Sequence, residues 1–362
     1  MEKVQQKLVD NIQIKNVPNV LGMVLLALCY FNYGNLDTGL LFFGYGVEMA
    51  KELKINTESG LEGLNLTLVI AEECRKLWWL IYGLDRTLSA VGKSRICDSD
   101  NAIYLPGTAN AEFSSSGDDI RFFGMQAMSA KEWYTPIIST NISAVRELQI
   151  TKLLGQAVKY RDIYSSKDTD ESAVIRLKLC NSLFLWHYNT KVLQGALNTK
   201  DACSLQGYLK YHYSMLITRG PHCYESLKKH SHKFLAENRI KMENLGLVCR
   251  EAKSIANLLL ELTRTGIDEL TSIFYFDYIF QASIPLLLNM DKPSVLNLVT
   301  TLNALISKYH LGYPILNFIV KHLNSNDVAT ILQEHEAYKF EEYLHTKNNS
   351  HSFINEFLIA EL

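Results

Sequence analysis

The stretch ECRKLWWLIYGLDRTLSA, from Glu73 to Ala90, indicates the fold class of this chain. Apolar and aromatic side chains recur along it at helical spacing. On a helical wheel the residues form three adjacent stripes: first Leu77, Ile81, Leu84 and Leu88, then Trp78, Tyr82, Asp85 and Ser89, then Arg75, Trp79, Tyr82 and Arg86. Because such groups cover most of the circumference, the helix is expected to be buried on several sides.

Asp85 would lie near the core in such a helix. An unpaired carboxylate is costly there, so Asp85 should meet a basic side chain from another helix or the amides at a helix N-terminus. Arg86 follows it directly in the sequence and is expected to point elsewhere. No second carboxylate or histidine stands at a supporting position, so the pattern does not favour a catalytic role for Asp85.

The remainder of the 362 residues shows a helical pattern nearly throughout. Only 7 prolines occur, which favours helices because proline removes a backbone donor and clashes inside a helix. Predicted helices cover residues 17–31, 173–198, 202–218, 222–235, 245–265, 271–289 and 294–309, with irregular connections near 97–128 and 165–172. We predict a large multi-helix all-α fold, a single domain over residues 1–362. Its motif-bearing part is 17–128, and its helical remainder is 129–362.

Two glycines stand inside one predicted helix, in LFFGYGVEMAKELKI from Leu41 to Ile55. Gly44 and Gly46 each cost a helix about 1 kcal/mol relative to alanine, and close approach by a neighbouring helix is the expected compensation. A nucleotide-binding GxGxxG motif is not formed, because Met49 occupies the third glycine position and no strand precedes it.

Charge and cysteine content narrow the functional classes. The formal net charge is −2, which argues against a broad basic face for nucleic acid and against a polybasic membrane patch. The 7 cysteines are widely spaced and include no CxxC pair, so neither a disulfide framework nor a structural zinc site is expected. The apolar run 272–288 is interrupted by Asp277, Gln281 and Pro285, which favours a buried core helix over a membrane span.

The opening stretch resembles the middle homology region of fungal zinc-cluster (Zn2Cys6) transcription factors. The motif residues stand in the family's order: Arg75, Lys76, Trp78, Trp79, Tyr82, Asp85, Arg86, Ser89, Gly92, Lys93, Ser94, Ile96, Asp98, Asp100, Leu105 and Pro106. Ser94 stands where the family usually has proline. The segments GYGVEMAKELKI (44–55) and YLKYHYSMLITRGP (208–221) are similar to two further helices of the family, and 267–288 is more loosely similar to the xylanolytic-activator branch.

The resemblance implies an all-helical regulatory domain that acts in RNA polymerase II transcription in the nucleus, without enzymatic activity. It implies a small-molecule effector or a co-regulator protein as partner, leaves a homodimer open, and involves no membrane. The residues that it marks as a structural or regulatory motif are Arg75, Trp78, Trp79, Tyr82, Asp85, Arg86, Gly92, Asp98, Asp100 and Pro106. For each of these residues taken individually, the favoured interpretation is that it only builds the core.

The family binds zinc through an N-terminal cluster of six cysteines, and no such array occurs in this chain. We therefore expect no cofactor here. Either the chain is a fragment that lacks the cluster, or the gene product never had one. Contact with DNA is expected only through a missing or separate zinc-cluster module, because no basic helix with interleaved aromatic residues offers a replacement.

Two other classes of function stay open. A helical scaffold or adaptor without a transcription role fits the absence of the cysteine module. An all-α enzyme of the terpene-synthase type is suggested by the acidic pair in DDIRF, Asp118 to Phe122, although the final carboxylate of the magnesium motif is replaced by phenylalanine. His222, His230 and His232 could serve a metal, but an i, i+2 pair on a helix does not converge. His187 is interpreted as a partly buried structural histidine.

Overall fold

The computed structural model describes residues 13–32, 35–90, 142–164, 169–197, 202–230, 239–265, 272–309, 312–324 and 328–337. Within these ranges the chain forms helices and no strand, so the predicted all-α class is confirmed. The helices are α2 (Val17–Asn32), α3 (Leu36–Glu52), α4 (Glu58–Gly63), α5 (Leu68–Ala90), α7 (Ile142–Tyr164), α8 (Asp170–Leu197), α9 (Ala202–His230), α10 (Arg239–Thr265), α11 (Ser272–Leu288), α12 (Lys292–Tyr309), α13 (Tyr313–His322) and α14 (Val328–Ala337).

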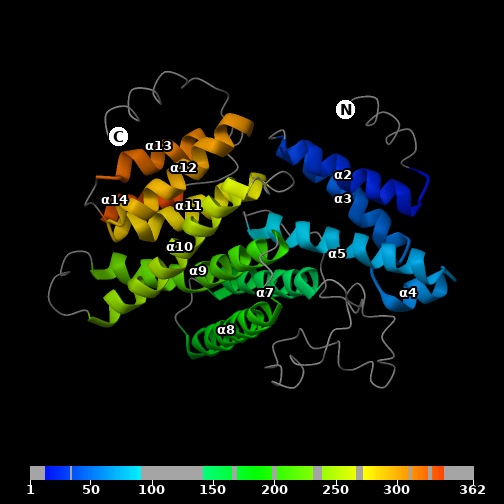
Figure 1. Cartoon of the computed structure of the whole chain (residues 1–362), viewed down its shortest axis with the longest axis horizontal. Coiled ribbons are helices and arrows are strands. Elements are labelled where there is room, and N and C mark those ends of the chain that lie inside the picture. Colours follow the sequence, from blue (N-terminus) through cyan, green and yellow to red (C-terminus); the bar gives the residue numbers. More distant parts are fainter. Residues whose placement is uncertain are drawn as a thin grey trace.

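The helix α5 lies between two parts of the molecule (Figure 1). On one side it meets the antiparallel pair α2 and α3, and on the other it packs against α7. From there, α7 packs on α8 and α9, α9 on α10, and α10 on α11 and α12. The stretch that indicated the fold class thus forms a helix between the N-terminal helices and the rest of the chain, and α2 also contacts α11 directly.

The pair α2 and α3 depends on a close approach at glycine. A Cβ atom added to Gly46 would lie 3.2 Å from Cγ2 of Val24 and 3.4 Å from Cβ of Met23, so the predicted close approach is confirmed at Gly46. The prediction is wrong at Gly44, where an added Cβ atom would meet no heavy atom within 4 Å. Gly44 therefore lowers the helix propensity of α3, and no close helix packing at this position compensates for that cost.

The helix α9 differs from the prediction. Residues 202–218 and 222–235 were expected to form two helices, and Gly220 and Pro221 lie between them. The structure has one continuous helix with Pro221 inside it. Side chains on both sides of the proline are buried, among them Ile217 and Tyr224. Their packing outweighs the cost of about 3 kcal/mol that an interior proline imposes.

The long apolar run predicted to be a buried helix forms α11, and its residues from Tyr275 to Leu287 are almost all buried. Among the helices that the structure describes, none is both long and apolar enough to span a bilayer. The helix α3 is capped by Asn35, whose side chain accepts a hydrogen bond from the backbone N–H of Thr38.

Candidate functional site

The motif residues of α5 form an interior cluster. Trp78 is 1% exposed and Asp85 is 1% exposed, and the neighbouring Trp79, Tyr82 and Arg86 are buried as well. The prediction that the paired indoles and their neighbouring charges lie in the core is therefore confirmed. The last four motif residues, Gly92, Asp98, Asp100 and Pro106, lie outside the described residues, as does the acidic pair of the terpene-synthase interpretation.

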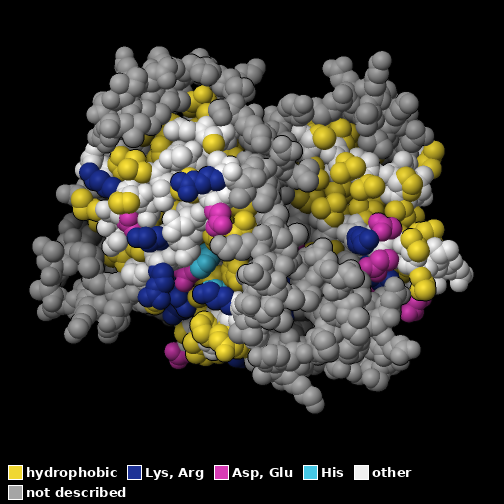
Figure 2. Space-filling view, in the orientation of Figure 1, with side chains coloured by type: hydrophobic (Ala, Val, Ile, Leu, Met, Phe, Trp, Pro, Cys, Tyr) yellow, Lys and Arg dark blue, Asp and Glu magenta, His cyan; other side chains and the backbone are white. Residues whose placement is uncertain are grey.

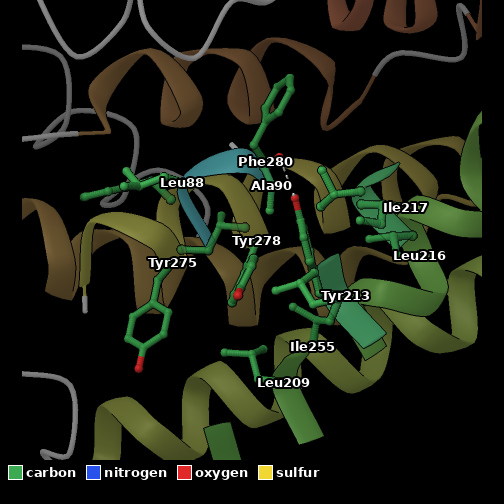
Figure 3. Packing of buried hydrophobic residues seen from close by; sticks show 14 of the residues in the cluster. Leu88, Ala90, Leu209, Tyr213, Leu216, Ile217, Ile255, Tyr275, Tyr278 and Phe280 are labelled. Atoms are coloured by element: carbon green, nitrogen blue, oxygen red, sulfur yellow. Dashed lines mark hydrogen bonds between the residues drawn. The ribbon is translucent and has the colours of Figure 1, made fainter. Parts of the chain in front are cut away.

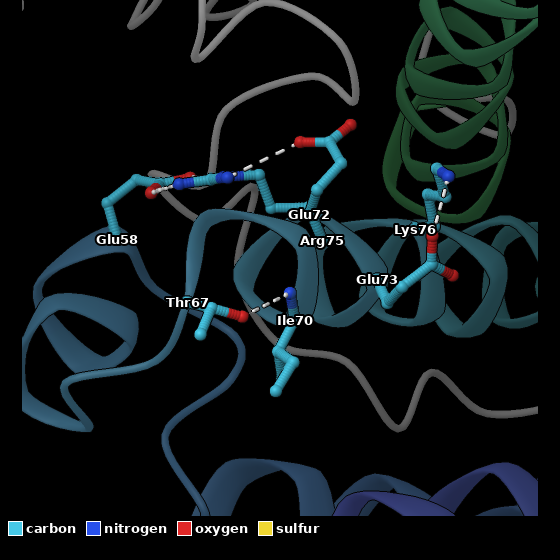
Figure 4. A network of polar contacts seen from close by, with 7 residues as sticks. All are labelled: Glu58, Thr67, Ile70, Glu72, Glu73, Arg75 and Lys76. Atoms are coloured by element: carbon cyan, nitrogen blue, oxygen red, sulfur yellow. Dashed lines mark hydrogen bonds and ion pairs between the residues drawn. The ribbon is translucent and has the colours of Figure 1, made fainter.

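Arg75, at the N-terminal end of this cluster, makes two hydrogen bonds to one carboxylate of another helix. Its Nε donates to Oε1 of Glu58 over 2.8 Å and its Nη2 donates to Oε2 of the same carboxylate over 2.7 Å. Glu72, one turn earlier on α5, accepts from Nη1 at 3.3 Å. Figure 4 shows Arg75 between the two carboxylates. The bond to Glu58 raises the pKa of Arg75 and ties α4 to α5.

The aromatic residues of the cluster carry cations on their ring faces. Trp79 and Tyr82 meet edge to face, with ring centroids 5.2 Å apart. The ammonium of Lys152, from α7, lies 4.9 Å from the Trp79 ring, and the guanidinium of Arg86 lies 4.6 Å from the Tyr82 ring. Such contacts contribute more in a desolvated interior than at an exposed site. The contact of Lys152 with Trp79 joins α7 to α5, whereas that of Arg86 with Tyr82 lies within α5.

The structure corrects the expectation for Arg86. Its Nη1 lies 3.3 Å from Oδ2 of Asp85, so the arginine does not point away from the preceding carboxylate. The arginine stem is long enough to fold back along the helix, which the direction of the Cα–Cβ bond alone does not show. A Cβ added to Gly155 of α7 would lie 2.6 Å from Cδ of Arg86, so that glycine makes room for the arginine.

The C-terminal end of α5 is closed by groups from two other helices. The last carbonyl groups of a helix have no partner within it and need donors from elsewhere. Arg161 of α7 donates from Nη1 to the carbonyl of Ala90 over 2.7 Å and from Nη2 to that of Ser89 over 3.1 Å. The hydroxyl oxygen of Tyr213, on α9, lies 3.4 Å from the carbonyl oxygen of Ala90. Figure 3 shows the Tyr213 hydroxyl group directed at Ala90 among buried side chains.

Asp277 of α11 completes this arrangement. It is buried and accepts a hydrogen bond from the hydroxyl group of Tyr213. Burial raises the pKa of Asp277 to about 6, while the bond from Tyr213, the charge of Arg161 and the bond from Gln281 act in the opposite direction. Burial, and then the negative charge of Asp277, raises the pKa of Tyr213 well above its ordinary value. Tyr213 therefore keeps its proton and acts as a donor.

We call Ser89, Ala90, Arg161, Tyr213 and Asp277 the α5 junction. It joins α5, α7, α9 and α11 through polar groups that are buried, apart from the partly exposed Arg161. Sequence reasoning did not find it. The bonds join residues more than sixty positions apart, and the one local signal was the aspartate inside the apolar run of α11, which was used only against a membrane span.

A second polar group lies where α8, α9 and α10 meet. Nδ1 of His212 lies 2.6 Å from Oε2 of Glu251, and the ring of His187 lies 4.4 Å from the ring of Tyr211. Burial, and then the nearby His212, lowers the pKa of His187 to about 4. His187 is therefore neutral near pH 7, and its half-buried place among aromatic rings agrees with the structural interpretation.

Of the three histidines weighed as metal ligands, His222 is the one whose side chain the structure describes. The ring of His222 is bonded through Nε2 to the hydroxyl group of Tyr160. His232 and the side chain of His230 lie outside the described residues. Across the parts of the chain that the structure describes, no three histidine, cysteine, aspartate or glutamate side chains are grouped so that they could hold a metal ion.

No family model, no curated protein and no solved structure matches this chain. The chemistry of the site is therefore inferred from its geometry. The site is a junction of charged and hydroxyl groups that holds the end of α5 against α7 and α9 and, through Tyr213, connects it to α11. Such a polar network orients and couples elements, because each bond that breaks leaves a polar group without water in the interior.

Proposed function

We propose that this chain is the regulatory domain of a transcription regulator similar to the fungal zinc-cluster family, acting in the nucleus on RNA polymerase II transcription. The observation that carries the proposal is the place of the motif. Six of the residues that resemble the family are interior parts of α5, and the end of the same helix is held by the α5 junction; the six are Arg75, Trp78, Trp79, Tyr82, Asp85 and Arg86. The proposed role is to regulate, without catalysis, through a partner that contacts DNA.

The α5 junction gives this proposal a physical route. A regulatory domain needs two arrangements whose balance a ligand can change, and a ligand changes that balance only when it binds one arrangement more tightly. In the interior, the carbonyl groups of Ser89 and Ala90 either keep their donors or lose them at a cost, which favours discrete arrangements over gradual ones. A small-molecule effector or a co-regulator protein that favours one arrangement would shift α5 relative to α7.

A reporter experiment tests the proposal. The full chain is fused to a heterologous DNA-binding module, and reporter output is compared with that of the module alone. Tyr213→Phe keeps the ring but removes the hydroxyl group that bonds to Ala90 and Asp277. Couplings of about 1 kcal/mol change an equilibrium about fivefold, so the variant should change reporter output by about that factor.

The matched control is Tyr45→Phe, at an exposed tyrosine on α3, which should leave the output unchanged. Both fusions are compared at equal protein level, measured by immunoblotting, so that a loss of folded protein is separated from a loss of regulation. A fusion whose output equals that of the DNA-binding module alone would count against a transcription role. That result would favour the scaffold or adaptor function instead.

A further inference from the structure

His187 connects α8 to α9 through ring contacts. The centroid of its ring lies 4.4 Å from that of Tyr211 and 5.5 Å from that of Tyr208. The ring of His212, also on α9, lies 5.9 Å away. The half-buried imidazole therefore stands on the docking face of α8, and any change in its charge acts directly on that contact.

The helix α8 lies at the edge of the molecule and packs against α7 and α9 (Figure 1). Its inner side carries the buried Leu183 and Trp186, whereas Phe184 and Tyr188 on its outer side are exposed. Helices at the edge of a fold can open locally at a lower free energy than global unfolding requires. The docking of α8 can therefore change while the rest of the fold stays intact.

The charges around His187 disfavour a proton on its ring. Lys191, one turn along α8, and His212 of α9 oppose a positive charge there, whereas Glu251 of α10 favours it. That carboxylate is already engaged, because its Oε2 lies 2.6 Å from Nδ1 of His212. In Figure 2, histidine, acidic and basic side chains lie together on the surface over α9 and α10.

The two tyrosines that contact His187 supply no compensating negative charge. Burial raises the pKa of Tyr208. Burial, and then the charge of Glu251, raises the pKa of Tyr211, while Arg219 of α9 acts in the opposite direction. Both hydroxyl groups therefore keep their protons in neutral and mildly acidic solution. The attraction of a cation to the two rings offsets only part of the cost of placing a charge between them.

We propose that His187 is an acid-sensitive contact, which holds α8 on α9 near neutral pH and favours local release of α8 in mildly acidic solution. In the docked helix the ring is half-buried beside Lys191 and His212, so the neutral form is favoured. In the released helix the ring returns to water and takes up a proton readily. Protons thus bind the released arrangement better and shift the equilibrium toward it. The inference does not depend on the proposed function.

The direction and size of the effect follow from proton linkage. The pKa of His187 is about 4 in the docked helix, below its ordinary value of 6.5, because of burial and then His212. Docking is therefore favoured in full above the ordinary value and is weakened as the pH falls toward the docked-state value. Each pH unit in that window changes the equilibrium by up to about tenfold. Because the ring is only half-buried, we expect about tenfold in all between about pH 7 and about pH 5.

Native-state hydrogen exchange of the full chain, measured by mass spectrometry at about pH 7 and about pH 5, tests the proposal. His187→Phe keeps an aromatic ring but cannot take up a proton. Because intrinsic exchange depends on pH, each amide is compared between wild type and variant at the same pH. The ratio of the wild-type rate to the variant rate in residues 170–186 should rise about tenfold from the higher to the lower pH. In residues 245–265 of α10 it should stay constant.

Two further variants complete the experiment. The matched control is Tyr188→Phe, at the exposed tyrosine that follows His187, which should exchange like the wild type at both pH values. His187→Gln is a second variant without the titrating ring, and it suits a half-buried polar position should phenylalanine disturb the packing. It should reproduce the pH dependence of His187→Phe.

Nuclear magnetic resonance of the histidine rings measures the docked state directly. The ring signal that is missing from the variants belongs to His187, and it should stay that of a neutral ring at pH 5 and titrate near pH 4.

Three results would overturn the proposal. The first is a rate ratio in α8 that does not change with pH, and the second is an equal rise in α10, which would mean global acid unfolding. The third is a His187 ring that titrates at its ordinary value in the folded protein.

Discussion

Asp85 carries a negative charge in the interior of α5, beside the guanidinium of Arg86. Removing one member of a buried ion pair leaves the other charge with less compensation, at a cost of about 3 kcal/mol or more. Asp85→Asn should therefore lower the free energy of unfolding by about that amount, measured from urea melts. Glu48→Gln is the control, because its ion pair with Lys51 lies on the surface, where such pairs contribute less than about 1 kcal/mol. A variant of Asp85 that melts like the wild type would contradict the prediction.

Asp277 makes stability depend on pH. Its folded-state pKa, about 6, lies above its ordinary value of 3.8, because burial disfavours the charged form despite Tyr213 on α9 and Arg161 on α7. Protonation thus stabilises the folded state: the contribution is complete below the unfolded pKa and is lost as pH rises through the folded one. The stability difference between wild type and Asp277→Asn should fall by roughly 1 kcal/mol from about pH 5 to about pH 7, measured by urea unfolding at several pH values. An unchanged difference would mean that the carboxyl group titrates normally.

At the scale of the element, α3 offers a matched pair of glycine substitutions. Gly44→Ala should raise the free energy of unfolding by about 0.5–1 kcal/mol, because alanine favours the helix and the site is open. Gly39→Ala should lower it, since an added Cβ would lie 2.4 Å from the ring of the buried Phe31. Thermal melts of both variants test this. Equal effects of the two substitutions would argue against the close approach of α2 and α3.

How far each element could be predicted depends on whether its signal is local. The burial of α5 follows from its own periodicity, and the interior place of Trp78 and Asp85 follows with it. The continuation of α9 through Pro221 does not, because tertiary packing overrides a local helix breaker. The α5 junction could not be predicted either, because it also depends on tertiary packing. Arg161 and Tyr213 contact Ala90 only after three helices have packed together, and the residues next to them in the sequence give no local signal of that contact.

At the scale of the whole molecule, the α5 junction should couple the N-terminal helices to the remainder. Arg161 is the residue through which α7 holds the end of α5, and charge-assisted bonds of this kind contribute about 1.5–3 kcal/mol. The substitution Arg161→Gln should therefore destabilise the helices from α2 to α5 more than the helices from α10 to α13. Backbone amides in residues 17–90 should exchange hydrogen about tenfold faster or more, while those in residues 245–265 change little, measured by native-state hydrogen exchange and mass spectrometry. The control is Arg250→Gln, at an exposed position on α10, which should leave both regions as in the wild type. Uniformly faster exchange across the described helices would mean that Arg161 contributes to overall stability without coupling the two parts.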